Sequence, residues 1–368
     1  MKSKILIILG TRPEIIKFFP IYKILKKNTN IKLITLFTNQ HLSKDMSGVF
    51  FDTFKFKLNY KIKYKNLDLT NKYAYYISEI SKYIQKINPK FTFVMGDTLS
   101  AATAAQASVI LKKPILYMES GLRTGDFNQP WPEEIFRKSI AQIATYHFTP
   151  TKYNKNNLIS EGVSSKNIFV TGNTVIDSIK FILKSIDKSQ ISKKYRNIYS
   201  LNNIVLCTIH RRENHGENLE KILNGIQNIS YKYPKFNFVI PVHPNPNVKN
   251  NIKKKLSGIK NIFVINPLDY KDFIKLANKS KLLISDSGGV QEECTVLGKR
   301  VIVLRNVTER PEAINKFLYM CGPNEKKLLK IFKEIIKLKQ PKPKNIFGNG
   351  NSGDIIASKI NQIISQRI

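Results

Sequence analysis

Short runs of branched apolar residues alternate along the whole chain with longer stretches in which apolar residues recur every three or four positions. The first pattern is typical of buried strands and the second of amphipathic helices, so their alternation predicts repeated strand–helix–strand units. Such units build parallel sheets with helices on both faces. The expected strands are Ile5–Leu9, Ile31–Phe37, Phe91–Met95, Ile115–Met118, His147–Thr149, Ile168–Val170, Ile204–Thr208, Phe236–Val242, Ile262–Ile265, Leu282–Ser285 and Val301–Leu304. The expected helices include Glu14–Leu25, Ala101–Leu111, Leu219–Ile229 and Tyr270–Asn278.

The chain is long enough for two such sheets. Its 368 residues correspond to roughly two domains of about 150 residues each. The strand pattern restarts after the polar stretch 187–203, which we expect to hold the linker, although the boundary could lie nearer Gly172. We therefore expect an α/β protein with two Rossmann-like, doubly wound parallel-sheet domains facing across a cleft. The first spans residues 1–172 and the second residues 173–353, and a final helix, Ile355–Ile364, follows.

The composition argues against several classes of protein. No run approaches the roughly 18 consecutive apolar residues of a membrane span. The net charge is +35, but only ten of the 61 basic residues are Arg, and the Lys residues are dispersed along the chain. We therefore expect neither a nucleic-acid nor a membrane partner. Cys207, Cys294 and Cys321 lie far apart, so we expect no disulfide and no zinc site, in a cytoplasmic or otherwise reducing compartment.

Polar and charged residues gather where the predicted strands end. Ligands of open α/β sheets bind beyond the carboxyl ends of the strands, so this recurrence predicts a ligand site in the cleft between the two domains. The segments are Gly10–Arg12, Gly96–Thr98, Glu119–Gly121, Gly172–Thr174, His210–Glu213, His243–Pro244 and Asp286–Gly289.

The junction between a strand and a helix at Ser287 has the features of a phosphate site. Gly288 and Gly289 allow backbone N–H groups to approach an anion at the start of a helix. Glu293 lies where a carboxylate can accept ribose hydroxyls. The alternative interpretation of Ser287–Gly289 is an ordinary helix cap, and the alternative for the cations named next is that each forms a surface ion pair. Three cations near strand ends suit a diphosphate: Arg12, Lys17 and Arg310.

Groups able to transfer protons lie in the same loops. Carboxylates clustered in a closed cleft raise one another's pKa and can divide the acid and base roles. His210 ends a strand, and the neighbouring Arg211 and Arg212 favour its neutral form. No metal site is expected, because His210 and His215 lack a helical His-Glu-x-x-His spacing. The candidates are Asp97, Glu119, Glu133, Glu134, His210 and His243.

Gly348–Gly353 matches the dinucleotide-binding fingerprint letter for letter. It follows a turn rich in Pro and Lys rather than a strand, so the context that the fingerprint requires is missing. We interpret the segment as a loop and expect no nicotinamide cofactor there.

Together these motifs resemble the non-hydrolysing UDP-N-acetylglucosamine 2-epimerase family over essentially the full chain. Many long motifs occur in the order typical of that family. They are Gly10–Lys17, Gly96–Thr98, Glu119–Asp126, Pro130–Glu134, Thr171–Asp177, His210–Asn214, Pro241–Val248, Ser285–Glu293 and Thr308–Ala313.

The resemblance implies a fold and a reaction. The fold is the glycosyltransferase-B arrangement, with a last helix, residues 354–368, joining the first domain. The reaction is the reversible conversion of UDP-GlcNAc to UDP-ManNAc by a cytoplasmic homodimer, without metal or redox cofactor, to supply cell-surface polysaccharide. The implied catalytic residues are Asp97, Glu119, Glu133 and His210. The implied UDP-sugar ligands are Arg12, Lys17, His243, Phe273, Ser287, Gly288, Gly289, Glu293 and Arg310.

Some members of the family bind a second UDP-GlcNAc as an activator through a Gln-His pair, which Gln40 and His41 match. Four alternatives to the UDP-GlcNAc 2-epimerase hypothesis stay open at this stage. They are an epimerase of a 6-deoxy or uronic acid UDP-sugar, a UDP-sugar glycosyltransferase of the same fold, a hydrolysing relative that releases free sugar, and a basic nucleic-acid-binding protein.

Overall fold

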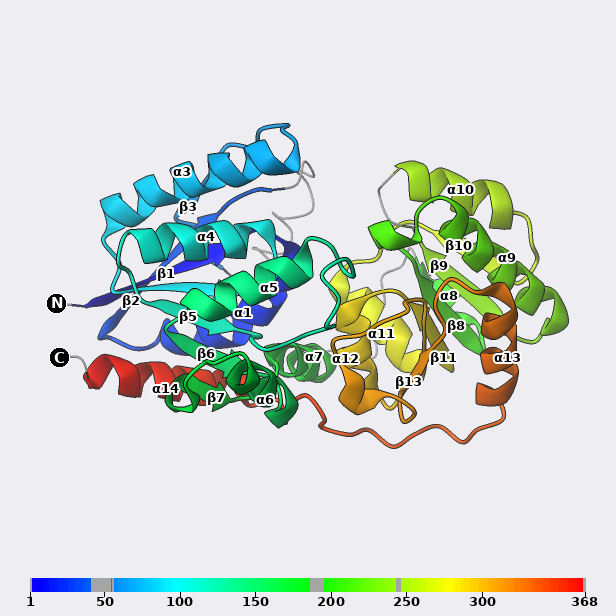
Figure 1. The fold of residues 1–368 in the computed structure, drawn as a ribbon. Coiled ribbons are helices and arrows are strands. Elements are labelled where there is room, and N and C mark those ends of the chain that lie inside the picture. Colours follow the sequence, from blue (N-terminus) through cyan, green and yellow to red (C-terminus); the bar gives the residue numbers. More distant parts are fainter. Residues whose placement is uncertain (1, 41–53, 55, 186–194, 243–245, 367–368) are drawn as a thin grey trace. The chain divides into compact units, whose positions relative to one another are not determined.

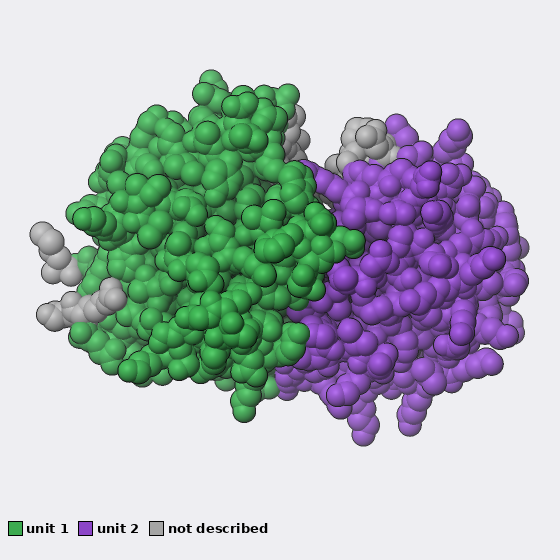
Figure 2. Space-filling model, in the orientation of Figure 1, with its two compact units in different colours: residues 1–178, 347–368 green, residues 179–346 purple. Residues whose placement is uncertain are grey.

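The computed structural model describes residues 2–40, 54, 56–185, 195–242 and 246–366. The chain forms two compact units, coloured separately in Figure 2. Unit 1 comprises residues 1–178 and 347–368, and unit 2 comprises residues 179–346. The boundaries expected at 172 and 353 therefore differ from the observed ones by six or seven residues. The cleft expected between the units stays a prediction.

Unit 1 contains a seven-stranded, wholly parallel sheet with the strand order β3-β2-β1-β4-β5-β6-β7. The order changes direction between β1 and β4, which is the switch point of a doubly wound sheet. The strands are β1 Ser3–Leu9, β2 Ile31–Phe37, β3 Tyr60–Lys61, β4 Phe91–Met95, β5 Ile115–Met118, β6 Tyr146–Thr149 and β7 Ile168–Val170. Only β3 is absent from the sequence prediction, because a two-residue strand carries no periodic signal.

Helices cover both faces of this sheet (Figure 1). On one face Leu6 and Ile8 of β1 pack with residues of α3, α4 and α5. On the other, the ring of Phe18 in α1 meets Phe93 of β4 edge to face, with the centroids 4.9 Å apart. The helices are α1 Arg12–Leu25, α3 Leu69–Ile87, α4 Leu99–Ile110, α5 Glu133–Ile143, α6 Lys152–Ser160, η1 Ser165–Asn167, α7 Thr174–Ser185 and α14 Ser352–Ser365.

Helices α7 and α14 both contact α1 near its internal proline, Pro20. Pro20 lies inside this helix and has no N–H, so the carbonyl of Ile16 lacks its usual helical donor. The hydroxyl of Ser178, in α7, donates to that carbonyl at 2.7 Å. Gly353 of α14 packs against Pro20, where a Cβ would lie 2.8 Å from the proline Cβ, and its N–H donates to Asp177. The start of α7 therefore belongs to unit 1.

Gly172 and Gly348 mark the point where the returning chain crosses the segment after β7. A Cβ on Gly172 would lie 2.9 Å from the Cα of Gly348, and both residues have positive φ. The N–H of Asn173 donates to the carbonyl of Phe347 at 2.6 Å. Residues 348–351 are a loop, as expected, whereas Ser352 and Gly353, which were expected in the same loop, begin α14. Gly348 allows the close backbone approach to Gly172.

Unit 2 contains a six-stranded parallel sheet with the order β10-β9-β8-β11-β12-β13, so its switch point lies between β8 and β11. The strands are β8 Ile204–Thr208, β9 Asn237–Pro241, β10 Ile262–Ile265, β11 Leu282–Ser285, β12 Val301–Val303 and β13 Leu318–Met320. β13 is the strand that the sequence pattern misses. The two sheets confirm the expected fold class.

One face of this sheet packs under α9, α10 and α13, where Phe332 meets Phe238 of β9. The helices are α8 Arg196–Ser200, η3 Arg212–Asn214, α9 Glu217–Lys232, α10 Pro246–Leu256, α11 Tyr270–Lys279, α12 Gly288–Leu297, η4 Pro311–Ala313 and α13 Glu325–Ile335. The linker expected at 187–203 is wrong in its second half. Residues 196–200 form α8, and Tyr199 donates to the carbonyl of Asp272 in α11.

All three cysteines are buried and free, and Cys207 and Cys321 lie in the core of unit 2. Within the described ranges, no helix is both long enough and apolar enough to cross a membrane.

Candidate active site

In unit 1 the loop after β1 is organised by Glu14. Its carboxylate accepts hydrogen bonds from the N–H of Gly10 at 2.7 Å and the N–H of Thr11 at 2.6 Å. It also accepts from the hydroxyl of Thr98, which follows β4, at 2.8 Å. Glu14 therefore joins the two loops at the switch point of the first sheet. Its burial raises its pKa to about 7, against the lowering effect of these hydrogen bonds.

Two of the predicted cations belong to the same helix. Arg12 is the first residue of α1 and is half-buried, and burial lowers the pKa of its guanidinium. Lys17, just over one turn later, is buried and forms an ion pair with Glu119, which follows β5. The structure thus brings together two predicted residues that are 102 positions apart.

The backbone places the carboxylate of Glu119 beside the end of β4. Glu119 has a φ of +60°, a left-handed conformation that turns the chain immediately after β5. Gly96 has a φ of +68°, which favours glycine, and a Cβ there would lie 3.5 Å from Oε2 of Glu119, an ordinary contact. The side-chain amide of Asn173 donates to Oε1 at 3.1 Å. Glu119 is thus held by a cation and an amide, both buried.

Asp97 is paired with Arg137, a residue that sequence reasoning did not select for the site. Arg137 is buried in α5 and contacts Asp97 through Nη2 and Glu134 through Nη1, the latter at 2.9 Å. The other oxygen of Glu134 accepts from the N–H of Thr124 at 3.1 Å. Asp97 keeps 27% of its side chain exposed, so one carboxylate of this network stays accessible while Glu134 is fully buried.

Glu133 begins α5, immediately before Glu134. The sequence favoured Glu133 of this pair, and the structure gives Glu134 the contact with Arg137. The two are adjacent residues at a helix start, where carboxylates interact favourably with the helix dipole.

In unit 2 the cation Arg310 lies against the start of α12. A Cβ on Gly288 would lie 3.1 Å from Nη1 of Arg310. The guanidinium is buried and donates to Glu292 at 2.7 Å and to Glu309 at 3.0 Å. Glu309 also holds Arg305, whose Nη1 lies 3.0 Å away. Arg310 is therefore part of a buried ion network rather than a surface ion pair.

The helix start itself carries the glycines that the sequence singled out. Ser287 precedes α12, whose first residues are Gly288 and Gly289. Glu293, the sixth residue of this helix, accepts from the hydroxyl of Tyr270 at 2.8 Å. Burial, followed by the charge of Glu293, raises the pKa of Tyr270 well above its ordinary value. Tyr270 thus fixes one oxygen of Glu293 from α11.

His210 follows β8 and contacts Asp286, which follows β11. Nδ1 of His210 lies 3.2 Å from Oδ1 of Asp286. Asp286 is fully buried, whereas 35% of the His210 side chain is exposed. The sequence placed both residues at strand ends but expected Arg211 and Arg212 to govern the histidine. The group that the structure places at Nδ1 is a carboxylate.

The remaining predicted residues have separate positions. Phe273 is half-buried in α11. Gln40 accepts hydrogen bonds from the N–H of Ser100 at 3.1 Å and from its hydroxyl. His243 and His41 lie outside the described residues.

His147 is a packing residue of unit 1 and is not one of the candidate site residues described above. His147 is buried in β6, where its Nδ1 lies 3.0 Å from the hydroxyl of Ser120. Burial lowers its pKa to about 4, so it packs as a neutral ring. In the described part of the chain no three His, Cys, Asp or Glu side chains gather as a metal ion requires.

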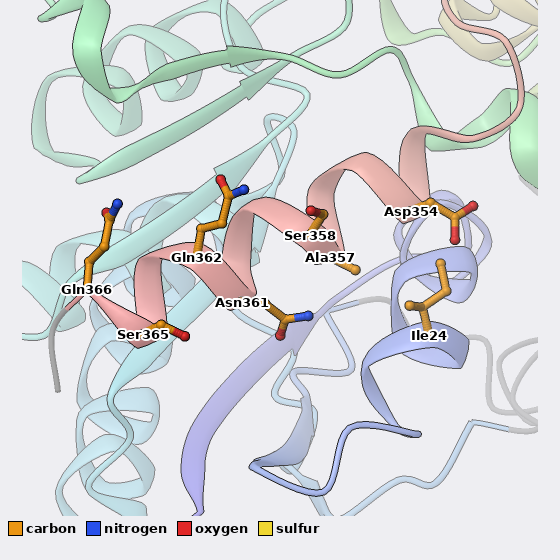
Figure 3. Close-up of a pocket in the computed structure, with 8 residues that line it drawn as sticks. All are labelled: Ile24, Asp354, Ala357, Ser358, Asn361, Gln362, Ser365 and Gln366. Carbon is orange, nitrogen blue, oxygen red and sulfur yellow. The ribbon is translucent and has the colours of Figure 1, made fainter.

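A surface hollow of unit 1 lies apart from all of these residues. It is lined by α14 together with Ile24 of α1, and Figure 3 shows mostly small or amide side chains around it. It contains none of the predicted site residues. The charged groups described above lie instead at the carboxyl ends of the strands, where ligands of such sheets bind.

Known proteins match both the sequence and the structure. A family model described as UDP-N-acetylglucosamine 2-epimerase matches residues 23–361. The enzyme of that name from Neisseria meningitidis is 37% identical over 369 residues, covering 97% of this chain and 99% of that protein. Its crystal structure bound to UDP-GlcNAc has a TM-score of 0.93 at 36% identity, covering 98% and 100% of the two chains. The Methanocaldococcus jannaschii UDP-GlcNAc 2-epimerase, in complex with UDP-GlcNAc and UDP, has a TM-score of 0.90 at 35% identity, with the same coverage.

The two parallel-sheet units and these matches define an α/β protein of the glycosyltransferase-B type, in the class of the epimerases. The chain belongs to the UDP-N-acetylglucosamine 2-epimerase family. The family and the fold class expected from the motifs are confirmed.

Proposed function

We propose that this protein interconverts UDP-GlcNAc and UDP-ManNAc by eliminating UDP and adding it back. The observation that carries the proposal is the pair of acids at neighbouring strand ends in unit 1. Asp97 and Glu119 follow β4 and β5, and each contacts a buried cation. Membership of the family supplies the substrate class.

The chemistry explains why such groups are needed. The hydrogen at C2 is not adjacent to a carbonyl, so its direct removal is costly. Breaking the bond between C1 and the diphosphate oxygen sends the electron pair to UDP, develops positive charge at C1 and acidifies C2. A carboxylate then takes the C2 proton, and the C1–C2 double bond of a 2-acetamidoglucal forms. Protonation on the other face and return of UDP complete the epimerisation, so two proton-transfer groups are required.

Unit 1 supplies the acids in this proposal. Asp97, Glu119 and Glu133 are the candidates for proton transfer. The partially exposed carboxylate of Asp97 is kept in place by Arg137, and Glu119 by Lys17. Arg12 and Lys17 add positive charge that favours a departing diphosphate.

Unit 2 supplies the other proposed nucleotide ligands, in addition to Arg12 and Lys17 of unit 1. The first N–H groups of α12, at Gly288 and Gly289, and the guanidinium of Arg310 suit a diphosphate. Glu293, whose Oε1 is fixed by Tyr270, is the proposed acceptor for ribose hydroxyls. The other proposed contacts to the UDP-sugar are Ser287, Phe273 and His243, and His210 is the proposed catalytic residue of this unit.

The test is incubation of the protein with UDP-GlcNAc in deuterated water, with NMR detection at the sugar C1 and C2. We expect UDP-ManNAc to form with deuterium at C2 and no free sugar to accumulate. Free ManNAc would indicate a hydrolase, and unchanged UDP-GlcNAc would contradict the proposal. The same assay with EDTA and without NAD checks the expectation that no metal or redox cofactor is needed. The homodimer, the supply of polysaccharide precursors and allosteric activation through Gln40 and His41 stay predictions.

A further inference from the structure

Asp286 is a fully buried carboxylate to which the reaction above assigns no role. It follows β11 at the switch point of the second sheet, beside the loop that follows β8. A buried carboxylate is costly unless donors surround it. All of the side-chain contacts that we identify for Asp286 come from that neighbouring loop.

Four groups of the loop contact the Asp286 carboxylate. The N–H of His210 donates to Oδ2 at 2.9 Å and lies 3.2 Å from Oδ1. The N–H of Arg211 donates to Oδ2 at 2.9 Å, and the side-chain amide of Asn214 donates to Oδ2 at 3.0 Å. Nδ1 of His210 lies 3.2 Å from Oδ1. Oδ2 is therefore saturated by three donors, and Oδ1 faces the ring.

This division of the two oxygens fixes the histidine. An ionised carboxylate only accepts hydrogen bonds, so a ring nitrogen in contact with it carries a proton. In a neutral imidazole the other nitrogen then has the free lone pair. We propose that Asp286 is a positioning residue that holds His210 as the Nδ1–H tautomer, so that Nε2 accepts a hydrogen bond or a proton from the UDP-sugar. The inference rests on the proposed function, which places His210 at the substrate.

The geometry predicts a specific effect of Asp286→Asn. The single oxygen of the amide is required at the Oδ2 position, where three donors converge. The NH₂ group must then occupy the Oδ1 position and donate to Nδ1 of His210. Nδ1 can accept only when it is unprotonated, so the proton moves to Nε2. The variant keeps the shape of the side chain and reverses the tautomer.

The first measurement is the ¹⁵N NMR spectrum of histidine-labelled wild-type protein without substrate, at a pH where the His210 ring is neutral. The chain has five histidines, and the signal that disappears in His210→Gln assigns the ring. We expect Nδ1 to be protonated in the wild type and Nε2 in Asp286→Asn. A wild-type ring protonated at Nε2, or a variant with an unchanged tautomer, would overturn the proposal.

The second measurement is turnover of UDP-GlcNAc with UDP affinity and melting temperature alongside. We expect Asp286→Asn to lose roughly 10²–10⁴-fold in kcat, the usual contribution of a proton-transfer group, with UDP affinity within about twofold of wild type. Asn214→Ala is the matched control, because it removes one donor to Asp286 and leaves the carboxylate in place. It should retain the Nδ1–H tautomer and lose much less activity.

These outcomes separate the inference from the proposed function. Equal losses in Asn214→Ala and Asp286→Asn, with no change in tautomer, would show that the loop is merely disordered and would refute the positioning role. Full turnover in Asp286→Asn with a reversed tautomer would refute it as well. If His210→Gln retains full turnover, His210 has no part in the reaction and the role of Asp286 falls with it. The epimerase activity of the wild-type protein is tested by the NMR assay in deuterated water, independently of the Asn214→Ala, Asp286→Asn and His210→Gln variants.

Discussion

Both sheets have a buried carboxylate at the switch point, but the two carboxylates differ in what they bind. Glu14 joins the loops after β1 and β4, and Asp286 joins the loops after β8 and β11. Glu14 accepts from backbone N–H groups and hydroxyls, none of which titrates near neutral pH. Asp286 accepts in addition from the ring of His210. A buried carboxylate therefore joins two loops in each unit. Of these two carboxylates, only Asp286 is also proposed to set which nitrogen of a histidine ring carries the proton.

The surroundings of the charged residues differ between the units in a second way. In unit 1 two of the proposed reactive carboxylates contact a cation, Glu119 with Lys17 and Asp97 with Arg137. In unit 2 the cation Arg310 contacts two fully buried carboxylates, Glu292 and Glu309. In unit 1, therefore, cations hold the carboxylates of Asp97 and Glu119 in place. In unit 2, carboxylates hold the guanidinium of Arg310 in place. This contrast matches acid–base chemistry in the first and anion binding in the second.

The largest expected effect comes from removing the acids of unit 1. Asp97→Asn, Glu119→Gln and Glu133→Gln should each lose roughly 10²–10⁴-fold in turnover, because an amide cannot transfer the proton. UDP affinity should stay close to wild type, since none of these three acids is a proposed nucleotide ligand. Calorimetric titration with UDP and deuterium exchange at C2 measure the two properties separately. Exchange near the wild-type rate in all three variants would refute the assignment.

Arg310→Ala should affect both binding and stability. A diphosphate would lose a charge-assisted hydrogen bond of roughly 1.5–3 kcal/mol. Glu292 and Glu309 would also lose a buried partner, which typically costs about 3–5 kcal/mol of folding free energy. Arg310→Lys should restore only part of the UDP affinity and of the stability, because lysine lacks the planar guanidinium with its paired N–H donors. UDP titration and urea unfolding test this, and an unchanged affinity in the alanine variant would remove Arg310 from the site.

Glu14 should give stability a pH dependence that Glu14→Gln lacks. Burial raises its pKa from an ordinary 4.5 to about 7. Between these values the folded state holds a proton that the unfolded state releases, so the contribution of Glu14 to stability falls as the pH rises from 4.5 to 7. The full change is about 3 kcal/mol from the linkage relation. Urea unfolding of wild type and variant at pH 4.5, 6 and 8 measures it, and parallel curves would show that the pKa is not raised.

Two adjacent glycines provide the smallest and most local comparison. In Gly288→Ala the new Cβ would lie 3.1 Å from Nη1 of Arg310, so the guanidinium must shift by a few tenths of an ångström. In Gly289→Ala the nearest atom is Oε1 of Glu293 at 3.8 Å, an ordinary contact. Since Ala is favoured over Gly in helices by roughly 0.5–1 kcal/mol, Gly289→Ala should raise the melting temperature of the free protein and Gly288→Ala should not. Equal increases would show that Arg310 does not pack against Gly288.

The sequence predicted where the candidate site residues lie in the fold better than it predicted which residues contact them. Asp97, Glu119, His210 and Arg310 stand near strand ends, and the period of the apolar residues is enough to find those ends. Their partners Arg137, Glu292 and Asp286 come from other segments, and only the folded sheet brings them together. Asp286 carried the same strand-end signal as Asp97, so it could have been selected.

The boundaries of the units were less predictable for a different reason. α7 begins in the packing of unit 1, through the bond from Ser178 to Ile16 and the contact of Asp177 with Gly353. Neither contact leaves a mark in the local sequence pattern, because each depends on a residue more than 150 positions away. β3 and α8 were missed because they are too short to show a period.

The crossing at Gly172 and Gly348 has a consequence for the order in which the protein can be completed during its synthesis. Unit 2, residues 179–346, is one continuous stretch, whereas unit 1 needs residues 347–368 to cover α1. At a translation rate of roughly 5–20 residues per second, the 168 residues of unit 2 take on the order of ten to thirty seconds to emerge. During that time the region of α1 around Pro20 lacks its packing contact with α14. The part of the chain that is made first is therefore the last to be finished.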